Sequence, residues 1–100
     1  KNYEDAVQFF GMIDKEDHNA QTLLCWGNAY LELGEFEKAL EKLATVRSEY
    51  QLFQEDAIWY SAMAYLRMED IRKVREAEEL LFPGKYKQNL QEIIKALDSE

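Results

Sequence analysis

The feature of this sequence that most restricts its fold is a self-similarity with a period near 34 residues. Residues 3–13 and 36–46, 33 positions apart, share an aromatic residue, an alanine three positions later and two further apolar residues at helical spacing. Residues 23–30 and 58–65, 35 positions apart, share an aliphatic residue, a small residue four positions later and then a tyrosine. Patterns of helical spacing that return at a fixed period predict repeated helix pairs that bury their apolar faces against one another.

Two glycines among residues 23–46, Gly27 and Gly34, have different expected roles. Gly27 lies inside an expected helix, where glycine costs about 1 kcal/mol relative to alanine. We expect this glycine, and Ala62 at the matching site, to let a neighbouring helix approach closely. Gly34 follows one apolar-periodic run and precedes the next. It is therefore expected to end a helix with a positive φ angle, which glycine adopts without strain.

The hydrophobic periodicity predicts an all-α fold of six helices. Their expected ranges are 2–14, 20–33, 36–48, 55–67, 70–81 and 86–98. Asn19 and Asp70 are the residue types that cap helix N-termini, and Pro83-Gly84 interrupts the chain before the last helix. That last helix has one apolar stripe and one polar face, so we expect it to close the end of the array.

This pattern resembles the tetratricopeptide repeat family over nearly the whole chain. Residues 20–53 match best: the small residue of the first helix falls on Gly27, the turn on Gly34, and the second-helix alanine on Ala39. The later copy is more divergent, because it lacks both glycines and has Glu78 where an apolar residue is expected.

The resemblance implies a right-handed α-solenoid of antiparallel helix hairpins in a single domain, residues 1–100. Within it, residues 1–19 are the second half of a repeat, 20–53 a full repeat, 54–82 a full but divergent repeat, and 83–100 a capping helix. Because residues 2–14 match only a second helix, we expect Tyr3, Phe10 or Ile13 to be partly exposed. The chain would then be a piece of a longer protein, or another subunit would cover this edge.

Composition argues against several classes of partner. Twenty acidic and twelve basic residues give a net charge of −8, which repels nucleic acid and anionic membranes over a Debye length of about 10 Å. No apolar run reaches the roughly 18 residues of a membrane span, so we expect no direct membrane contact by this region.

The compartment stays open at this stage. The stretch from Ala57 to Ile71 is similar to the last repeat of bacterial tetratricopeptide proteins. Some of these proteins are held on the outer side of the inner membrane by an anchor, which would lie upstream of Lys1. A cytoplasmic domain and an extracytoplasmic domain of an anchored protein both remain possible.

His18 and Cys25 are the only imidazole and thiol and therefore the only candidates for a nucleophilic pair. Such a pair needs contact at about 3 Å, whereas seven helical residues span about 10 Å. We expect a solvated loop histidine, a small apolar cysteine and no catalysis. A tetrahedral zinc site would need two more ligands, and no calcium or phosphate motif occurs. No metal or cofactor is expected.

One concentration of basic side chains has two interpretations. It could hold an acidic motif or a phosphate, or it could form a charged outer face beside neighbouring carboxylates, which we favour. Its members are Arg67, Arg72, Lys73 and Arg75.

The resemblance also implies where a partner would bind, because the first helix of each repeat in this family lines a concave groove. The expected groove residues are Leu24, Asn28, Leu31, Trp59, Tyr60, Met63 and Arg67. The clamp that some members use for a C-terminal carboxylate is matched only by Asn28, whereas its basic positions carry Gln21, Leu24 and Tyr60.

A largely apolar groove favours an amphipathic helix or an extended apolar segment as ligand. The expected function is thus a non-catalytic scaffold for protein–protein interaction. Two alternatives accompany it. The groove side chains could pack against one another or against preceding helices, and the domain could serve structure or self-association through its N-terminal edge.

Overall fold

The computed structural model describes residues 2–99 as an all-helical domain. Its elements are α1 (Tyr3–Gly11), the 3-10 turn η1 (Lys15–Asp17), α2 (Ala20–Glu32), α3 (Phe36–Glu49), α4 (Gln54–Arg67), α5 (Ile71–Leu80) and α6 (Lys85–Asp98). No strand occurs within residues 2–99, which confirms the predicted all-α class.

The helices match their expected ranges closely except at the end of α1, which stops at Gly11 rather than at residue 14. The N–H groups of Met12 and Ile13 donate to the carbonyls of Phe9 and Phe10, three residues back. This tighter bonding ends the α-helix in a single turn.

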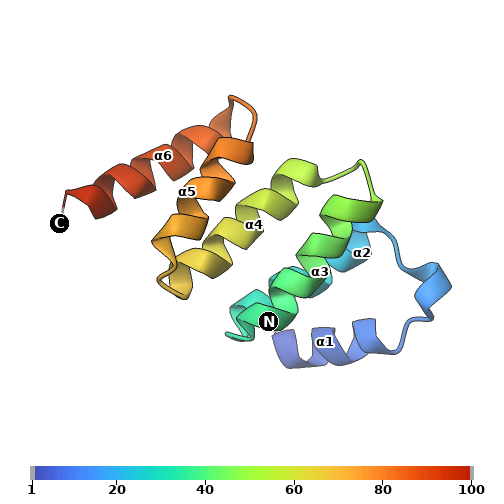
Figure 1. Ribbon diagram of the computed structural model, residues 1–100. Helices are drawn as coiled ribbons and strands as arrows, with labels where there is room; N and C mark the ends of the chain where they lie inside the picture. The colour runs from blue at the N-terminus through green and yellow to red at the C-terminus, as the bar shows by residue number, and fades with distance from the viewer. Residues whose placement is uncertain (1, 100) are drawn as a thin grey trace.

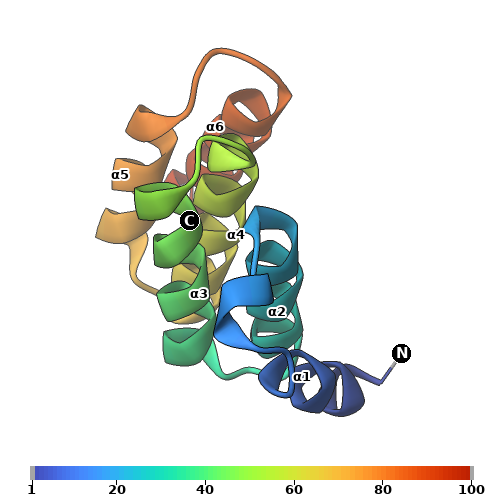
Figure 2. The same cartoon turned by 90° about the vertical axis from the view of Figure 1, so that its right-hand side faces the viewer.

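Consecutive helices contact one another and alternate in direction along the chain (Figure 1). Turned by 90°, the molecule shows α3 and α5 on one side and α2, α4 and α6 on the other (Figure 2). The helices α1 and α6 lie at opposite ends (Figure 1). Among residues 2–99, no helix has the length and apolar character needed to cross a membrane.

The apolar core lies between these two sets of helices. Its largest fully buried side chains are Leu43 and Val46 of α3, Val74 of α5 and Leu90 of α6. Leu43 and Val46 form one cluster with residues of α2 and α4, and Val74 and Leu90 form another with residues of α4. The helix α4 therefore contributes buried residues to both clusters.

Gly27 and Ala62 are both buried, as predicted for the small residues of the two patterns. A Cβ placed on Gly27 would lie 3.0 Å from Cγ and Cδ2 of Leu43 and 3.4 Å from the carbonyl oxygen of Ala39. Ala62 is 0% exposed. The absence of a side chain at position 27 is thus what lets α3 lie so close to α2.

The turns after α2 and α4 have the same backbone geometry. Gly34 has a φ of 80° and Glu69 a φ of 63°, so both residues are left-handed. In each turn, the N–H of the following residue donates over 2.9 Å to a tyrosine carbonyl five residues back, that of Tyr30 or Tyr65. This is the Schellman arrangement for ending a helix. The 35-residue period therefore persists in the backbone even where glutamate replaces glycine.

Side chains cap several helix ends. The predicted N-caps are confirmed, because Oδ1 of Asn19 accepts from the N–H of Thr22 (2.8 Å) and Oδ1 of Asp70 from that of Lys73 (3.3 Å). At the end of α3, where no proline occurs, the Gln54 side-chain amide donates to three carbonyl oxygens of residues 46, 47 and 50. These bonds satisfy acceptors that a helix C-terminus leaves free.

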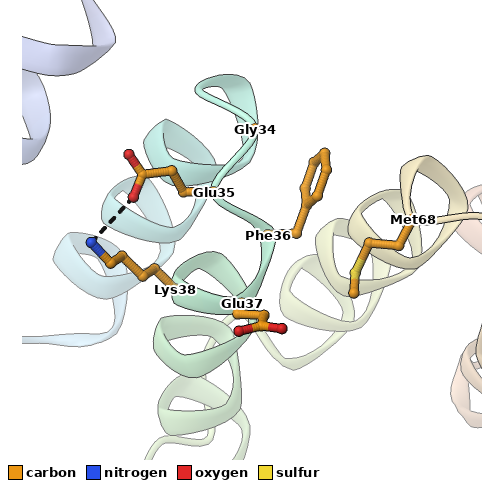
Figure 3. Close-up of a pocket in the computed structure, with 6 residues that line it drawn as sticks. All are labelled: Gly34, Glu35, Phe36, Glu37, Lys38 and Met68. Atoms are coloured by element: carbon orange, nitrogen blue, oxygen red, sulfur yellow. Dashed lines mark ion pairs between the residues drawn. The ribbon is translucent and has the colours of Figure 1, made fainter.

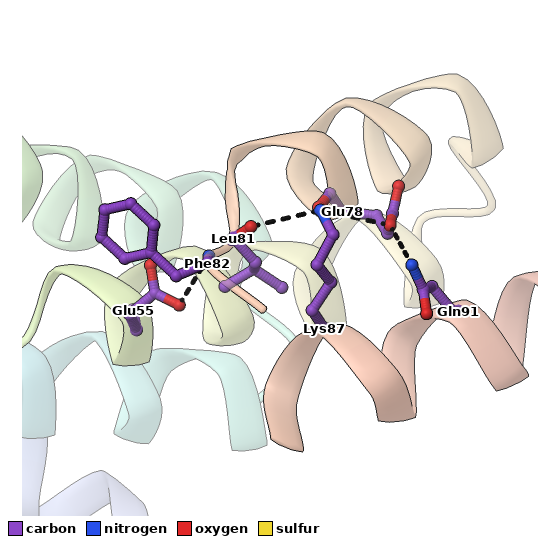
Figure 4. Close-up of polar contacts among 6 residues, drawn as sticks. All are labelled: Glu55, Glu78, Leu81, Phe82, Lys87 and Gln91. Carbon is purple, nitrogen blue, oxygen red and sulfur yellow. Dashed lines mark hydrogen bonds and ion pairs between the residues drawn. The ribbon is translucent and has the colours of Figure 1, made fainter. Parts of the chain in front are cut away.

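The last helix is held by a polar cluster (Figure 4). Lys87 Nζ lies 3.3 Å from Oε2 of Glu78 and donates to the carbonyl oxygens of Glu78 (2.7 Å) and Leu81 (3.1 Å). Gln91 Nε2 donates to Oε2 of Glu78 over 2.8 Å. Glu78, which breaks the apolar pattern of the repeat, therefore links α5 to α6.

Candidate functional site

Five of the predicted groove residues form what we call the α2–α4 surface. Its members, all half-buried, are Leu24, Asn28, Trp59, Tyr60 and Met63. Leu24 and Asn28 lie four residues apart on α2, and on α4 Trp59 and Tyr60 precede Met63 by four and three residues, so the members of each helix lie toward one side of it. The helices α2 and α4 are in contact, and Tyr60 packs against the clusters that contain Trp26 and Leu31 of α2. The surface is therefore partly exposed, mainly apolar and built on two rigid helices.

Two other predicted groove residues lie elsewhere. Leu31 is only 3% exposed and belongs to a core cluster with Ala39 and Ala64. The expectation that it lines a groove is wrong, because the small Ala64 lets α2 and α4 come together around it. Arg67 is exposed, and its guanidinium carbon lies 5.4 Å from the centroid of the Phe36 ring.

Trp59 has a partner that the sequence reasoning missed. Its ring is stacked on that of Tyr86 in α6, with 5.1 Å between centroids and 14° between planes. The Tyr86 hydroxyl donates to Oδ1 of Asp56. This hydrogen bond, together with burial, raises the pKa of Tyr86 to about 12. The available signal was the position of Tyr86 one turn before Leu90, on the apolar stripe of α6.

Close to Tyr86 in the sequence, the loop before α6 exposes an aromatic side chain. Phe82 is 73% exposed, and its backbone N–H donates to Oε1 of Glu55 over 3.1 Å. The Phe82 ring lies beside Glu55 in Figure 4. A cavity of about 430 Å³ is lined by Glu55, the loop from Phe82 to Lys85, Tyr86 and Asn89. Tyr86, which stacks on Trp59, and the exposed Phe82 therefore add aromatic side chains outside the α2–α4 surface.

A separate hollow of about 390 Å³ lies between the turn at residues 34–38 and Met68 (Figure 3). Its one ion pair joins Lys38 Nζ to Oε1 of Glu35 over 3.2 Å, and these side chains are 63% and 47% exposed. An exposed pair of this kind is screened by water and holds a ligand weakly. This hollow therefore brings together no set of groups suited to catalysis.

The structure corrects both expectations for the candidate nucleophilic pair. His18 is half-buried rather than solvated, because its ring lies edge-on to Trp26 at 5.3 Å and its Nε2 is 3.2 Å from the carbonyl oxygen of Ile13. Cys25 is exposed on α2 rather than packed as a small apolar residue. His18 thus serves to pack the loop before α2 against Trp26.

The basic side chains near the start of α5 are each engaged. Arg72 lies 3.3 Å from Glu76, and Arg75 pairs with Asp98 of α6. Lys73 Nζ lies 5.9 Å from the centroid of the Tyr65 ring. The favoured interpretation, a charged outer face, agrees with these contacts. Throughout residues 2–99, no three histidine, cysteine, aspartate or glutamate side chains come together as a metal site would require.

Comparison with known proteins assigns neither a family nor a function to the chain. No family model, curated protein or solved structure matches the chain. The α2–α4 surface is therefore interpreted from its own residues.

Proposed function

We propose that this chain is a tetratricopeptide-like helical-repeat module, an α-solenoid, that binds a segment of another protein on its α2–α4 surface and performs no catalysis. The repeat assignment is supported by the matching turns at Gly34 and Glu69. It is also supported by a side-chain contact that recurs at the 35-residue offset. Lysine Nζ lies 5.8 Å from the ring of Tyr30 in one copy and 5.9 Å from that of Tyr65 in the other.

The observation that carries the binding proposal is the half-burial of Trp59, Tyr60 and Met63 on α4. Tyr60 packs against the same cluster as Leu24 of α2, and Trp59 and Met63 pack against the cluster shared with α5 and α6. Aromatic side chains that a scaffold already holds lose little conformational entropy when a partner covers them, so they serve as anchors. Methionine adapts its shape to different apolar ligands. This combination suits an amphipathic helix or an extended apolar segment.

The polar groups of the surface narrow the choice of ligand. Asn28 offers one amide for orientation, and none of the five members is basic. A C-terminal carboxylate would need positive partners to offset its desolvation. The net charge of −8 also disfavours nucleic acid. The proposed ligand is therefore an apolar stretch of protein whose contacts come mostly from side chains.

The test compares the same substitution at two methionines, Met63 within α4 and Met68 just after it. Met63→Lys places a charge on the α2–α4 surface, whereas Met68→Lys places the same charge on a residue just beyond α4 that is 40% exposed. Affinity purification from the source cells, with the thermal melt of each variant as a fold control, should lose a specific partner only with Met63→Lys. Equal recovery with both variants would refute the surface assignment.

Trp59→Ala is a less selective variant for this purpose. It removes a candidate anchor, but it also removes the stack on Tyr86 that helps hold α6. Tyr60→Ala leaves both partners of this stack in place and makes a suitable companion to Met63→Lys. Loss of the same partner with both variants would support a shared surface.

A further inference from the structure

The outer side of α1 exposes the apolar residue Phe9, and the C-cap residue Met12 is exposed as well. Phe9 is 59% exposed and Met12 is 77% exposed, whereas Val7 and Phe10 face the core cluster of α2 and α3. The Phe10 ring stacks on Trp26 at 6.0 Å between centroids. We call the exposed pair, Phe9 and Met12, the α1 face.

The two ends of the molecule differ in this respect. Every exposed residue of α6 is polar or charged except Ala96. The helix α3 packs between α2 and α4, whereas the extensive contacts of α1 are with α2. The exposed side of α6 itself is therefore polar, whereas α1 exposes Phe9; Phe82, in the loop before α6, is the exposed aromatic residue at the other end.

The second copy of the pattern shows what kind of element fits the α1 face. At the offset of 33 residues, Phe9 corresponds to Lys42 and Asp5 to Lys38. Lys42 Nζ lies 3.9 Å from the ring centroid of Trp26, and Lys38 Nζ lies 5.8 Å from that of Tyr30. In α3, this position thus contacts the aromatic side chains of the preceding antiparallel helix. The equivalent positions of α1 are both exposed, and one of them, Phe9, is apolar.

The charges of the N-terminal segment that contains the α1 face favour a basic occupant. Residues 2–17 contain one lysine, Lys15, and five exposed carboxylates: Glu4, Asp5, Asp14, Glu16 and Asp17. Within the described part of the chain, none of these carboxylates takes part in an ion pair. A second copy would bring the same negative surface and be repelled, whereas lysine or arginine would be attracted.

We propose that the α1 face docks a basic amphipathic helix of a partner protein, lying antiparallel to α1. Its apolar side chains cover Phe9 and Met12, and its basic side chains face the surrounding carboxylates. This interaction is independent of the ligand proposed for the α2–α4 surface.

A synthetic helix tests this proposal directly on the full chain. The probe is an 18-residue fluorescent peptide with leucine, tryptophan, glycine and tyrosine in the spacing of residues 23, 26, 27 and 30, and lysine on its remaining face. We expect fluorescence anisotropy to show binding that weakens at least tenfold with Phe9→Ser plus Met12→Ser. Phe82→Ser, a matched change at a residue that is 73% exposed, should leave the affinity unchanged.

Further arms separate the other occupants. A peptide with glutamate in place of each lysine should bind at least tenfold more weakly, and equal binding would overturn the charge argument. No binding of the lysine peptide, or binding unaffected by the α1 changes, would overturn the proposal. Binding abolished by Met63→Lys would assign the peptide to the α2–α4 surface instead. A concentration-dependent dimer that Phe9→Ser removes in light scattering would identify a second copy as the occupant and contradict it.

Discussion

Leu43 lies directly against the backbone of Gly27, where a Cβ would come within 3.0 Å of its Cγ and Cδ2. Leu43 is fully buried and is among the largest side chains of the core. Since a core at native density cannot make room for an added group without distortion, this contact sets the separation of α2 and α3. It also explains why a helix tolerates glycine near its centre.

We expect Gly27→Ala to destabilise the protein by up to about 2 kcal/mol, because overpacking costs about 1–3 kcal/mol and helix propensity returns only about 1 kcal/mol. Chemical denaturation measures the change in the free energy of unfolding. Gly11→Ala is the control: no atom lies within 4 Å of its added Cβ, so its stability should be unchanged or slightly higher. A stabilised Gly27→Ala variant would contradict the close contact.

Substitution of the two left-handed turn residues should change the stability of the protein in opposite directions. Glu69 has a φ of 63°, a conformation that costs a non-glycine residue about 1–2 kcal/mol. After the greater flexibility of glycine in the unfolded chain is subtracted, Glu69→Gly should stabilise by about 0.5–1 kcal/mol. Gly34→Ala should destabilise by about 1 kcal/mol for the same reason. Thermal melts of the two variants that shift in one direction would show that the turns are not equivalent.

The polar contacts between α5 and α6 should contribute more to the free energy of unfolding than an exposed ion pair does. Lys87→Ala leaves Glu78, whose side chain is 18% exposed, without its cation, at a cost of about 1–3 kcal/mol. Arg72→Ala removes an ion pair whose side chains are 76% and 52% exposed, and it should cost about 0.5 kcal/mol or less. Urea denaturation of both variants gives the comparison. Equal effects would mean that the cluster around Lys87 does not hold α6.

Tyr86 should make stability depend on alkaline pH. Its pKa is raised from 10.0 to about 12 in the folded protein, so the folded state favours the neutral phenol that donates to Asp56. The resulting stabilisation is fully present below pH 10 and is lost as the pH rises toward 12. Denaturation at several pH values should show this loss. Tyr86→Phe should remove this part of the alkaline decline, and an identical decline in that variant would contradict the assignment.

Much of the fold could be predicted from the sequence because local and tertiary signals agree. The apolar periodicity predicts the range of α2, the cap at Asn19 marks its start and the left-handed residue Gly34 follows its end, and all three are confirmed. Glu69 occupies the position of Gly34 at the 35-residue offset, but its left-handed conformation has no local signal in the sequence. Backbone hydrogen bonds impose it in spite of the propensity of glutamate.

The candidate site was less predictable, because it depends on which helix covers which residue. Leu31 was expected on the surface, yet Ala64 of another helix leaves it buried. Trp59 was identified, but its partner Tyr86 lies 27 residues away in a different helix. Glu78 stands where an apolar residue is expected, and its partner Lys87 lies in a different helix. Pairings of this kind follow from helix packing and not from spacing along one element.

Protein binding on the α2–α4 surface is tested most directly by site-specific photo-crosslinking in the source cells. A photoreactive phenylalanine analogue is placed at Met63 in one variant and at Met68 in another, and crosslinked products are identified by mass spectrometry. We predict that position 63 captures a specific partner through an apolar or amphipathic segment, and that position 68, just beyond α4, does not. Capture of that partner at position 68 but not at position 63 would contradict the proposed binding surface.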